Sequence, residues 1–165
     1  MKKTTIITIL AVILIFGGII WFGRPNLQNE TALLSGKQGQ LIVDGVDNYD
    51  FGTISMAAGN VKHAFKIKNT GNEAVVINKI YTSCMCTTAT LMMKDKQYGP
   101  YGMPGHGSIP KIGQNINQNE EAIIEVIFDP TAHGPAGVGR IQRTITIENN
   151  AGQPIELMFS AVVAP

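Results

Sequence analysis

The sequence predicts an all-β fold, a β-sandwich of seven or eight antiparallel strands preceded by one N-terminal transmembrane helix. The chain has 165 residues, enough for one domain with a short appendage. Short segments in which apolar and polar residues alternate recur from residue 40 onward, separated by Gly, Asn and Pro. A segment near the N-terminus is apolar on every face, and no stretch beyond it has the 3.6-residue period of an amphipathic helix.

The predicted helix covers residues 4–22, TTIITILAVILIFGGIIWF, which contain no charged side chain. A helix of this length spans about 28 Å, close to the thickness of the hydrocarbon core of a membrane. Lys2 and Lys3 precede the segment and Arg24 follows it. Because positive charge near a helix favours the cytoplasmic side, we expect the N-terminus in the cytoplasm and the rest of the chain beyond the membrane.

This organisation divides the chain into a signal anchor (residues 1–24), a polar tether (25–39) and a domain (40–165) that faces the periplasm or the cell exterior. A cleaved signal peptide is the alternative. The apolar segment is longer than the core of about 7–15 residues that is usual for signal peptides, and no Ala-x-Ala cleavage site follows it. We therefore expect an uncleaved, single-pass anchor.

Eight segments of the domain have the pattern of strands. In the last of them, every second residue from Ile155 to Val163 is apolar, which is typical of a strand that buries one face. Several short strands separated by turns favour a sandwich. The predicted strands are residues 40–43, 50–55, 61–69, 74–82, 87–92, 121–128, 140–148 and 154–163.

One connection has a strong turn signal. Residues 69–73, NTGNE, predict a hairpin that pairs residues 61–69 with residues 74–82. In the register that this turn sets, His63 lies opposite Ile80.

Composition and motifs narrow the function by exclusion. The formal net charge is +1, so the chain lacks the excess of basic residues that is typical of nucleic-acid binding. Its serines have no recognisable base and orienting group for nucleophilic catalysis. The glycines of residues 99–107 are not followed by the Lys-Ser/Thr of a phosphate loop. We therefore expect a protein that is not an enzyme and does not bind nucleic acid.

Five blocks of the sequence carry a resemblance to a known family: DFGTI (50–54), HAFKIKNTG (63–71), SCMCT (83–87), IFDP (127–130) and TITIENN (144–150). In this order they resemble an exported bacterial family catalogued as domain of unknown function 1573. The resemblance implies an immunoglobulin-like sandwich related to the Hydin-type domains of cilia and centrosomes, and it implies no established activity. The family usually has Gly between its two cysteines, where this chain has Met85.

Cys84 and Cys86 are the two cysteines of the chain, and three interpretations of them stay open. On an extended chain both side chains point to one face. A disulfide between them would be strained, because residues i and i+2 of a strand lie about 6.5–7 Å apart, and a strained disulfide favours thiol exchange. Alternatively, both cysteines are small buried residues at a strand end.

The third interpretation is a soft metal site. Thiolates and thioethers select Cu(I), and imidazole is a compatible ligand. Met103 and His106, in the sequence YGMPGHG, are the candidate further ligands, and His133 lies in another loop that could approach. Zinc is less favoured, because a closed structural site needs four Cys or His ligands in a spacing that this chain lacks.

The sequence favours a membrane-anchored, extracytoplasmic binding or structural module, whose partner would be another envelope protein. We interpret residues 94–119, rich in Gly and Pro, as an insertion at one end of the sandwich. Its Tyr98, Tyr101 and Met103 are the candidate contact groups for a partner. A copper-binding or carrier protein is the alternative, with copper as the one expected cofactor, and a thiol-redox protein is the second alternative.

Overall fold

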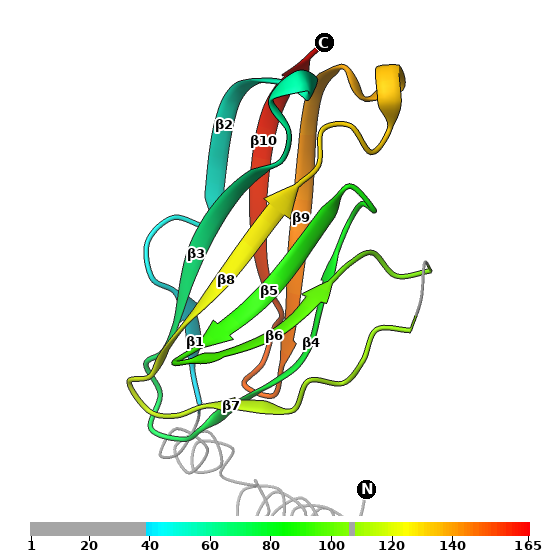
Figure 1. Ribbon diagram of the computed structural model, residues 1–165. Helices are drawn as coiled ribbons and strands as arrows, with labels where there is room; N and C mark the ends of the chain where they lie inside the picture. Colours follow the sequence, from blue (N-terminus) through cyan, green and yellow to red (C-terminus); the bar gives the residue numbers. More distant parts are fainter. Residues whose placement is uncertain (1–38, 106–107) are drawn as a thin grey trace, which may run out of the picture. The chain divides into compact units, whose positions relative to one another are not determined.

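The computed structural model describes residues 39–105 and 108–165, which form a β-sandwich (Figure 1). The predicted signal anchor, the tether up to residue 38, and His106 lie outside these residues. Within the two described ranges, no helix is long and apolar enough to cross a membrane.

The described residues form ten strands in two five-stranded sheets, A and B. The strand order is β1-β3-β8-β5-β6 in sheet A and β2-β10-β9-β4-β7 in sheet B. The all-β prediction is confirmed, but the sheets are mostly rather than wholly antiparallel, because β2 runs parallel to β10. The strands are β1 (Leu41–Val43), β2 (Asn48–Ser55), β3 (Val61–Asn69), β4 (Val75–Thr82), β5 (Thr87–Met93), β6 (Lys96–Tyr101), β7 (Gln114–Ile116), β8 (Glu121–Phe128), β9 (Gly139–Asn149) and β10 (Ile155–Ala164).

The core lies between the two sheets and consists of side chains from alternate strand positions. In β10, Leu157 and Phe159 are buried, as the alternation in the sequence predicts. In β3, Phe65 and Ile67 are buried, whereas Lys66 between them is exposed. Burial of each large apolar side chain stabilises the fold by about 1.5–3 kcal/mol. Two short 3-10 helices, η1 (Met56–Ala58) and η2 (Gly134–Gly137), lie in connections outside the sheets.

The expected count of seven or eight strands is wrong, because β6 and β7 lie inside residues 94–119, whose composition indicates an insertion. Both are edge strands: β6 pairs with β5, and β7 pairs with β4. An edge strand tolerates Gly and Pro, here Gly99 and Pro100 of β6, because one side of its backbone needs no partner. The Gly- and Pro-rich composition of residues 94–119 therefore does not indicate that they contain two strands.

The predicted hairpin between residues 61–69 and 74–82 is also wrong. β3 lies in sheet A and β4 lies in sheet B, so the connection between them crosses from one sheet to the other. His63 consequently lies opposite Val126 of β8 and not opposite Ile80.

A buried asparagine holds this connection in place. Asn69 is 0% exposed, and its Oδ1 accepts hydrogen bonds from the N–H groups of Gln40 (3.2 Å) and Gly71 (3.0 Å). Its Nδ2 donates to the carbonyl oxygens of Glu73 (2.8 Å) and Ile116 (2.9 Å). The side chain thus satisfies four backbone groups, which belong to three different segments of the chain.

Candidate functional site

The two cysteines lie in the connection between β4 and β5, which crosses from sheet B to sheet A. Hydrogen bonds hold this connection to both sheets. The N–H of Ser83 donates to the carbonyl of Thr144 in β9, and the N–H of Thr144 donates to Ser83 Oγ, each at 2.9 Å. The N–H of Asp129, just after β8, donates to the carbonyl of Cys86 at 2.9 Å. Elements distant in sequence therefore fix the position of the cysteines.

The connection is a turn, so the expectation of an extended chain at the cysteines is wrong. The N–H of Thr87 donates to the carbonyl of Cys84 at 3.2 Å, and the Thr82 hydroxyl donates to the same carbonyl at 3.0 Å. The N–H of Cys86 donates to Cys84 Sγ at 3.4 Å. Both cysteines are free thiols and are buried, whereas Met85 between them is 52% exposed. The strain expected for a disulfide between positions i and i+2 of a strand therefore does not apply to this turn.

His133 reaches the cysteines from the loop between β8 and β9. Asp129 shapes the start of this loop: its Oδ1 accepts hydrogen bonds from the N–H (2.8 Å) and the hydroxyl (2.6 Å) of Thr131. His133 is an exposed residue, and its Nε2 lies 3.1 Å from Cys84 Sγ. The ligand atoms of Cys84, Cys86 and His133 all lie within 4.8 Å of one another. Together they form a group that can hold a metal ion.

Arg143 of β9 contacts the same thiols. Its Nε donates to Cys86 Sγ at 3.2 Å, and its Nη1 donates to the carbonyl of Gln142 at 2.8 Å. Arg143 shares a strand face with the buried Ile145 and Ile147, so the guanidinium enters the sandwich from a core-facing position. Among the described residues, no ion pair links Arg143 to a carboxylate. Its positive charge therefore acts mainly on the sulfur atoms.

The two thiols have opposite pKa shifts. Burial raises the pKa of Cys84, but hydrogen bonds from Cys86 and His133, together with the positive charge of Arg143, lower the pKa from 9.0 to about 7. The pKa of Cys86 is raised, because burial and the hydrogen bond to Cys84 outweigh the hydrogen bonds from Arg143 and Thr87. Near neutral pH the pair therefore combines a partly ionised thiol, Cys84, with a protonated one, Cys86.

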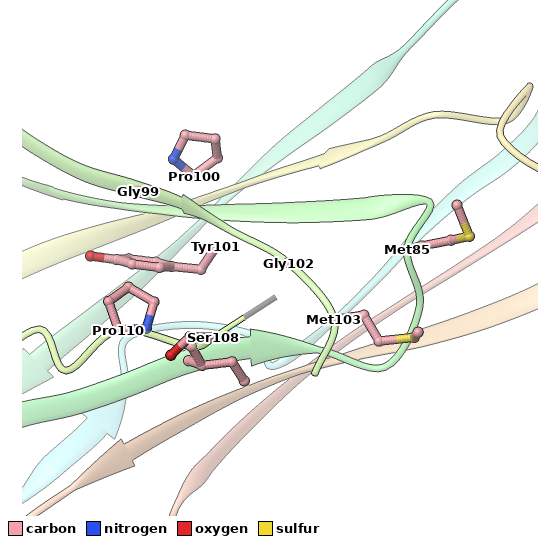
Figure 2. A pocket seen from close by; sticks show the side chains of 9 residues that line it. Met85, Gly99, Pro100, Tyr101, Gly102, Met103, Ser108 and Pro110 are labelled. Atoms are coloured by element: carbon pink, nitrogen blue, oxygen red, sulfur yellow. The ribbon is translucent and has the colours of Figure 1, made fainter. Parts of the chain in front are cut away.

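Of the residues that the sequence suggests as further ligands, His133 is the one that the structure places beside the thiols. Met103 lines a pocket of about 500 Å³ together with Met85 and Tyr101, and neither cysteine lines it (Figure 2). His106 lies outside the described residues. The third ligand that the structure supplies is the imidazole of His133.

The three candidate contact groups for a partner are divided between two pockets. Tyr101 and Met103 line the pocket in Figure 2, whereas Tyr98 lines a second pocket of about 300 Å³ beside Lys94. Tyr98 and Tyr101 lie in β6 and pack against the hydrophobic core. This arrangement therefore does not support a single contact surface made of all three residues, and that surface stays a prediction.

Arg143 is not among the candidate residues that the motifs indicate, although the sequence contains a signal for it. In the segment RIQRTITIE, Arg143 occurs in step with Ile141 and Ile145, at a position where alternation predicts an apolar residue. A charge on the buried face of a strand needs an opposite charge or hydrogen-bond partners. The signal does not identify Cys86 as that partner, because the contact joins residues that are far apart in sequence.

Residues 42–101 match a family model described as a protein of unknown function, DUF1573. Over these residues the chain is similar to the DUF1573 family. The resemblance seen in the sequence is thereby confirmed. Cys84 and Cys86 lie within the matched residues, whereas His133 and Arg143 lie beyond them. No curated protein matches the sequence.

Solved structures are similar to this domain in fold. A protein of unknown function from Porphyromonas gingivalis W83 is 18% identical with a TM-score of 0.57, and the match covers 81% of this chain and 51% of that one. The chain thus spans about half the length of that protein. A PapD-like domain of human CEP192 is 11% identical with a TM-score of 0.48, covering 77% of this chain and 87% of that one. The similarity to the bacterial protein supports the fold and nothing further.

Proposed function

We propose that this protein is a membrane-anchored, extracytoplasmic β-sandwich that binds a soft metal ion of the Cu(I) class through Cys84, Cys86 and His133. The observation that carries the proposal is the group of three ligand atoms within 4.8 Å of one another. Thiolate and imidazole bind a metal ion such as zinc at about 2.0–2.3 Å, so the ligand atoms around one ion lie at most about 4.6 Å apart. Small side-chain movements are therefore enough to bring the three residues to one ion.

The chemistry of the three ligand atoms favours copper over zinc. Two sulfur atoms and one imidazole nitrogen form a soft set, and such sets select Cu(I). A closed zinc site takes four protein ligands. Among the described His, Cys, Asp and Glu residues, no fourth member joins this group. The lowered pKa of Cys84 also favours metal binding, because the thiolate is the form that binds a metal.

The arrangement fits a carrier or a sensor better than a permanent structural site. Both thiols are buried and His133 is exposed, so in this proposal the imidazole is the ligand that an arriving ion meets first. In this proposal, residues 4–22 hold the domain at the outer face of the membrane. The partner is then another envelope protein that delivers the ion or receives it.

The proposal is tested by titrating the full-length chain, in detergent and under reducing conditions, with Cu(I) against a competing chromophoric chelator. We expect tight binding of one ion by the wild type, loss of that binding in the variant C84S/C86S, and weaker binding in His133→Asn. His63→Gln is the matched histidine control, because His63 stacks on Tyr49 with ring centroids 3.6 Å apart and is not in the ligand group. Equal, weak uptake by the wild type and the double variant would contradict the proposal.

A second candidate function is thiol–disulfide exchange, which the unequal pKa values of Cys84 and Cys86 favour. The Cys84 thiolate would attack a disulfide of a partner protein and form a mixed disulfide, releasing the first thiolate of the partner. Cys86 would then lose its proton and attack Cys84 Sγ, releasing the second thiolate. The pair is oxidised by two electrons to a disulfide, and the partner disulfide is reduced to a dithiol.

This second candidate is tested by mass spectrometry of the full-length chain after equilibration in glutathione buffers of increasing oxidised fraction. If the protein exchanges disulfides, a Cys84–Cys86 disulfide should form as the oxidised fraction of glutathione rises and should be reduced again as that fraction falls. A pair that stays a dithiol in oxidised glutathione would contradict exchange.

A further inference from the structure

We infer that Arg143 sets the selectivity of the thiol site by charge, favouring a monovalent ion over a divalent one. The inference rests on the proposed function and adds to it a residue that is not itself a ligand. It concerns a preference for the charge of the bound ion, which adds to the preference of the three soft ligand atoms for Cu(I).

The position of the guanidinium is well defined. Its Nε lies 3.2 Å from Cys86 Sγ, and its Nη1 is tied to the carbonyl of Gln142 at 2.8 Å. The side chain is half-buried, and in the described part of the chain it pairs with no carboxylate. Asp129, in the same loop as His133, directs Oδ1 to Thr131 and is not in the ligand group. The charge of Arg143 is therefore left for the sulfur atoms and whatever they bind.

The sum of the charges at the site favours a monovalent ion. A metal-bound cysteine is a thiolate and a metal-bound histidine is neutral, so the three ligands contribute two negative charges. Arg143 contributes one positive charge, because an arginine in a protein stays protonated. A monovalent ion brings this total to zero, whereas a divalent ion leaves one positive charge. Cys84 and Cys86 are only 9% and 2% exposed, so water screens that excess charge poorly.

The ratio of two affinities isolates this effect. The same empty site is the starting state for both ions, so its protonation cancels from the ratio. What remains is the interaction of Arg143 with each metal complex. Without the arginine, the complex of a monovalent ion carries one negative charge and attracts the guanidinium. The complex of a divalent ion is neutral without the arginine, so its interaction with the guanidinium is close to zero. If the side chain of Arg143 acted only by packing, its loss would change both affinities alike and leave the ratio unchanged.

The test measures the affinities of the full-length chain in detergent for Cu(I) and for Zn(II), each against a chromophoric chelator, in wild type and variants. We expect Arg143→Gln to lower the ratio of Cu(I) to Zn(II) affinity by about tenfold to a hundredfold. Arg143→Lys keeps the charge and is expected to stay near the wild-type ratio. The control is Arg140→Gln. Arg140 is exposed and lies on the opposite face of the same strand, so this change should leave the ratio unchanged.

Circular dichroism establishes that each variant is folded. If Arg143→Gln does not fold, Arg143→Met gives the same comparison, because it keeps an unbranched side chain and removes the charge. Equal changes in both affinities overturn the inference, as does a ratio that falls equally in the lysine and glutamine variants. A wild-type chain that binds neither ion overturns the proposed function, and the inference falls with it.

Discussion

Cys84 and Cys86 are two positions apart in the sequence, yet their surroundings make them chemically different. Cys84 Sγ receives a hydrogen bond from the N–H of Cys86 and contacts His133 Nε2, whereas Cys86 Sγ is the more deeply buried and contacts Arg143 and Thr87. Hydrogen bonds to sulfur stabilise the thiolate, and burial opposes it. At the scale of single residues, the site therefore has one acidic and one weakly acidic thiol.

This difference predicts the pH dependence of alkylation. Because the pKa of Cys84 is lowered from 9.0 to about 7, its reaction with iodoacetamide should reach half of its maximal rate near pH 7, with Cys86 reacting at higher pH. His133→Asn removes a hydrogen bond to Cys84 and should move the half-maximal rate of Cys84 to higher pH. The measurement is mass spectrometry of the labelled peptide, with fragmentation to separate the two sites. Two cysteines that react at equal rates near pH 9 would contradict the lowered pKa.

Among the elements, the crossing between β3 and β4 determines how the chain alternates between the sheets. Asn69 lies at the end of β3 and bonds to backbone groups before β1, in the turn itself and in β7. The partners Gln40 and Ile116 belong to segments that the hairpin prediction did not place nearby. A buried amide with all of its hydrogen bonds made is costly to remove, because its partners stay buried without replacements.

We therefore expect Asn69→Ala to destabilise the domain by about 2–4 kcal/mol. The control is Asn115→Ala in β7, because Asn115 is exposed and its change should shift stability by less than about 0.5 kcal/mol. Urea denaturation of both variants, compared at the transition midpoint with the slope unchanged, gives the difference. If both variants lose the same stability, the side chain of Asn69 does not hold the crossing.

The elements also show how far a sequence alone leads. Alternation located the eight main strands to within a few residues, because a strand that buries one face must alternate, as β10 does. It could not find β6, whose Gly99 and Pro100 suit an edge, nor decide whether β3 pairs with β4 or crosses to the other sheet. Pairing depends on the partner strand, so local sequence does not determine it. For the same reason, the sequence predicts only a part of the candidate site. Cys84 and Cys86 are neighbours in one sequence motif, whereas Arg143 comes from a strand that is distant in sequence.

At the scale of the whole domain, the site forms where two connections that cross between the sheets lie beside strand β9. The turn from β4 to β5 supplies both thiols, the loop from β8 to β9 supplies His133, and β9 supplies Arg143. The family match ends at residue 101, so the residues that complete the site come from the part of the chain beyond it. A relative that shares only the cysteines could therefore fold alike and differ in what its thiols bind.

The proposed chemistry also depends on the compartment that the domain occupies, which gives a prediction for the whole chain. Residues 4–22 and the flanking Lys2 and Lys3 predict a C-terminus beyond the membrane. Alkaline phosphatase fused after Pro165 should then be active, because its disulfides form outside the cytoplasm, and deletion of residues 1–24 should abolish that activity. A green fluorescent protein fused at the same position is the complementary reporter. Fluorescence from the intact chain, with an inactive phosphatase, would place the thiols in a reducing compartment, where a Cys84–Cys86 disulfide would not persist and thiol exchange would lose its oxidising partner.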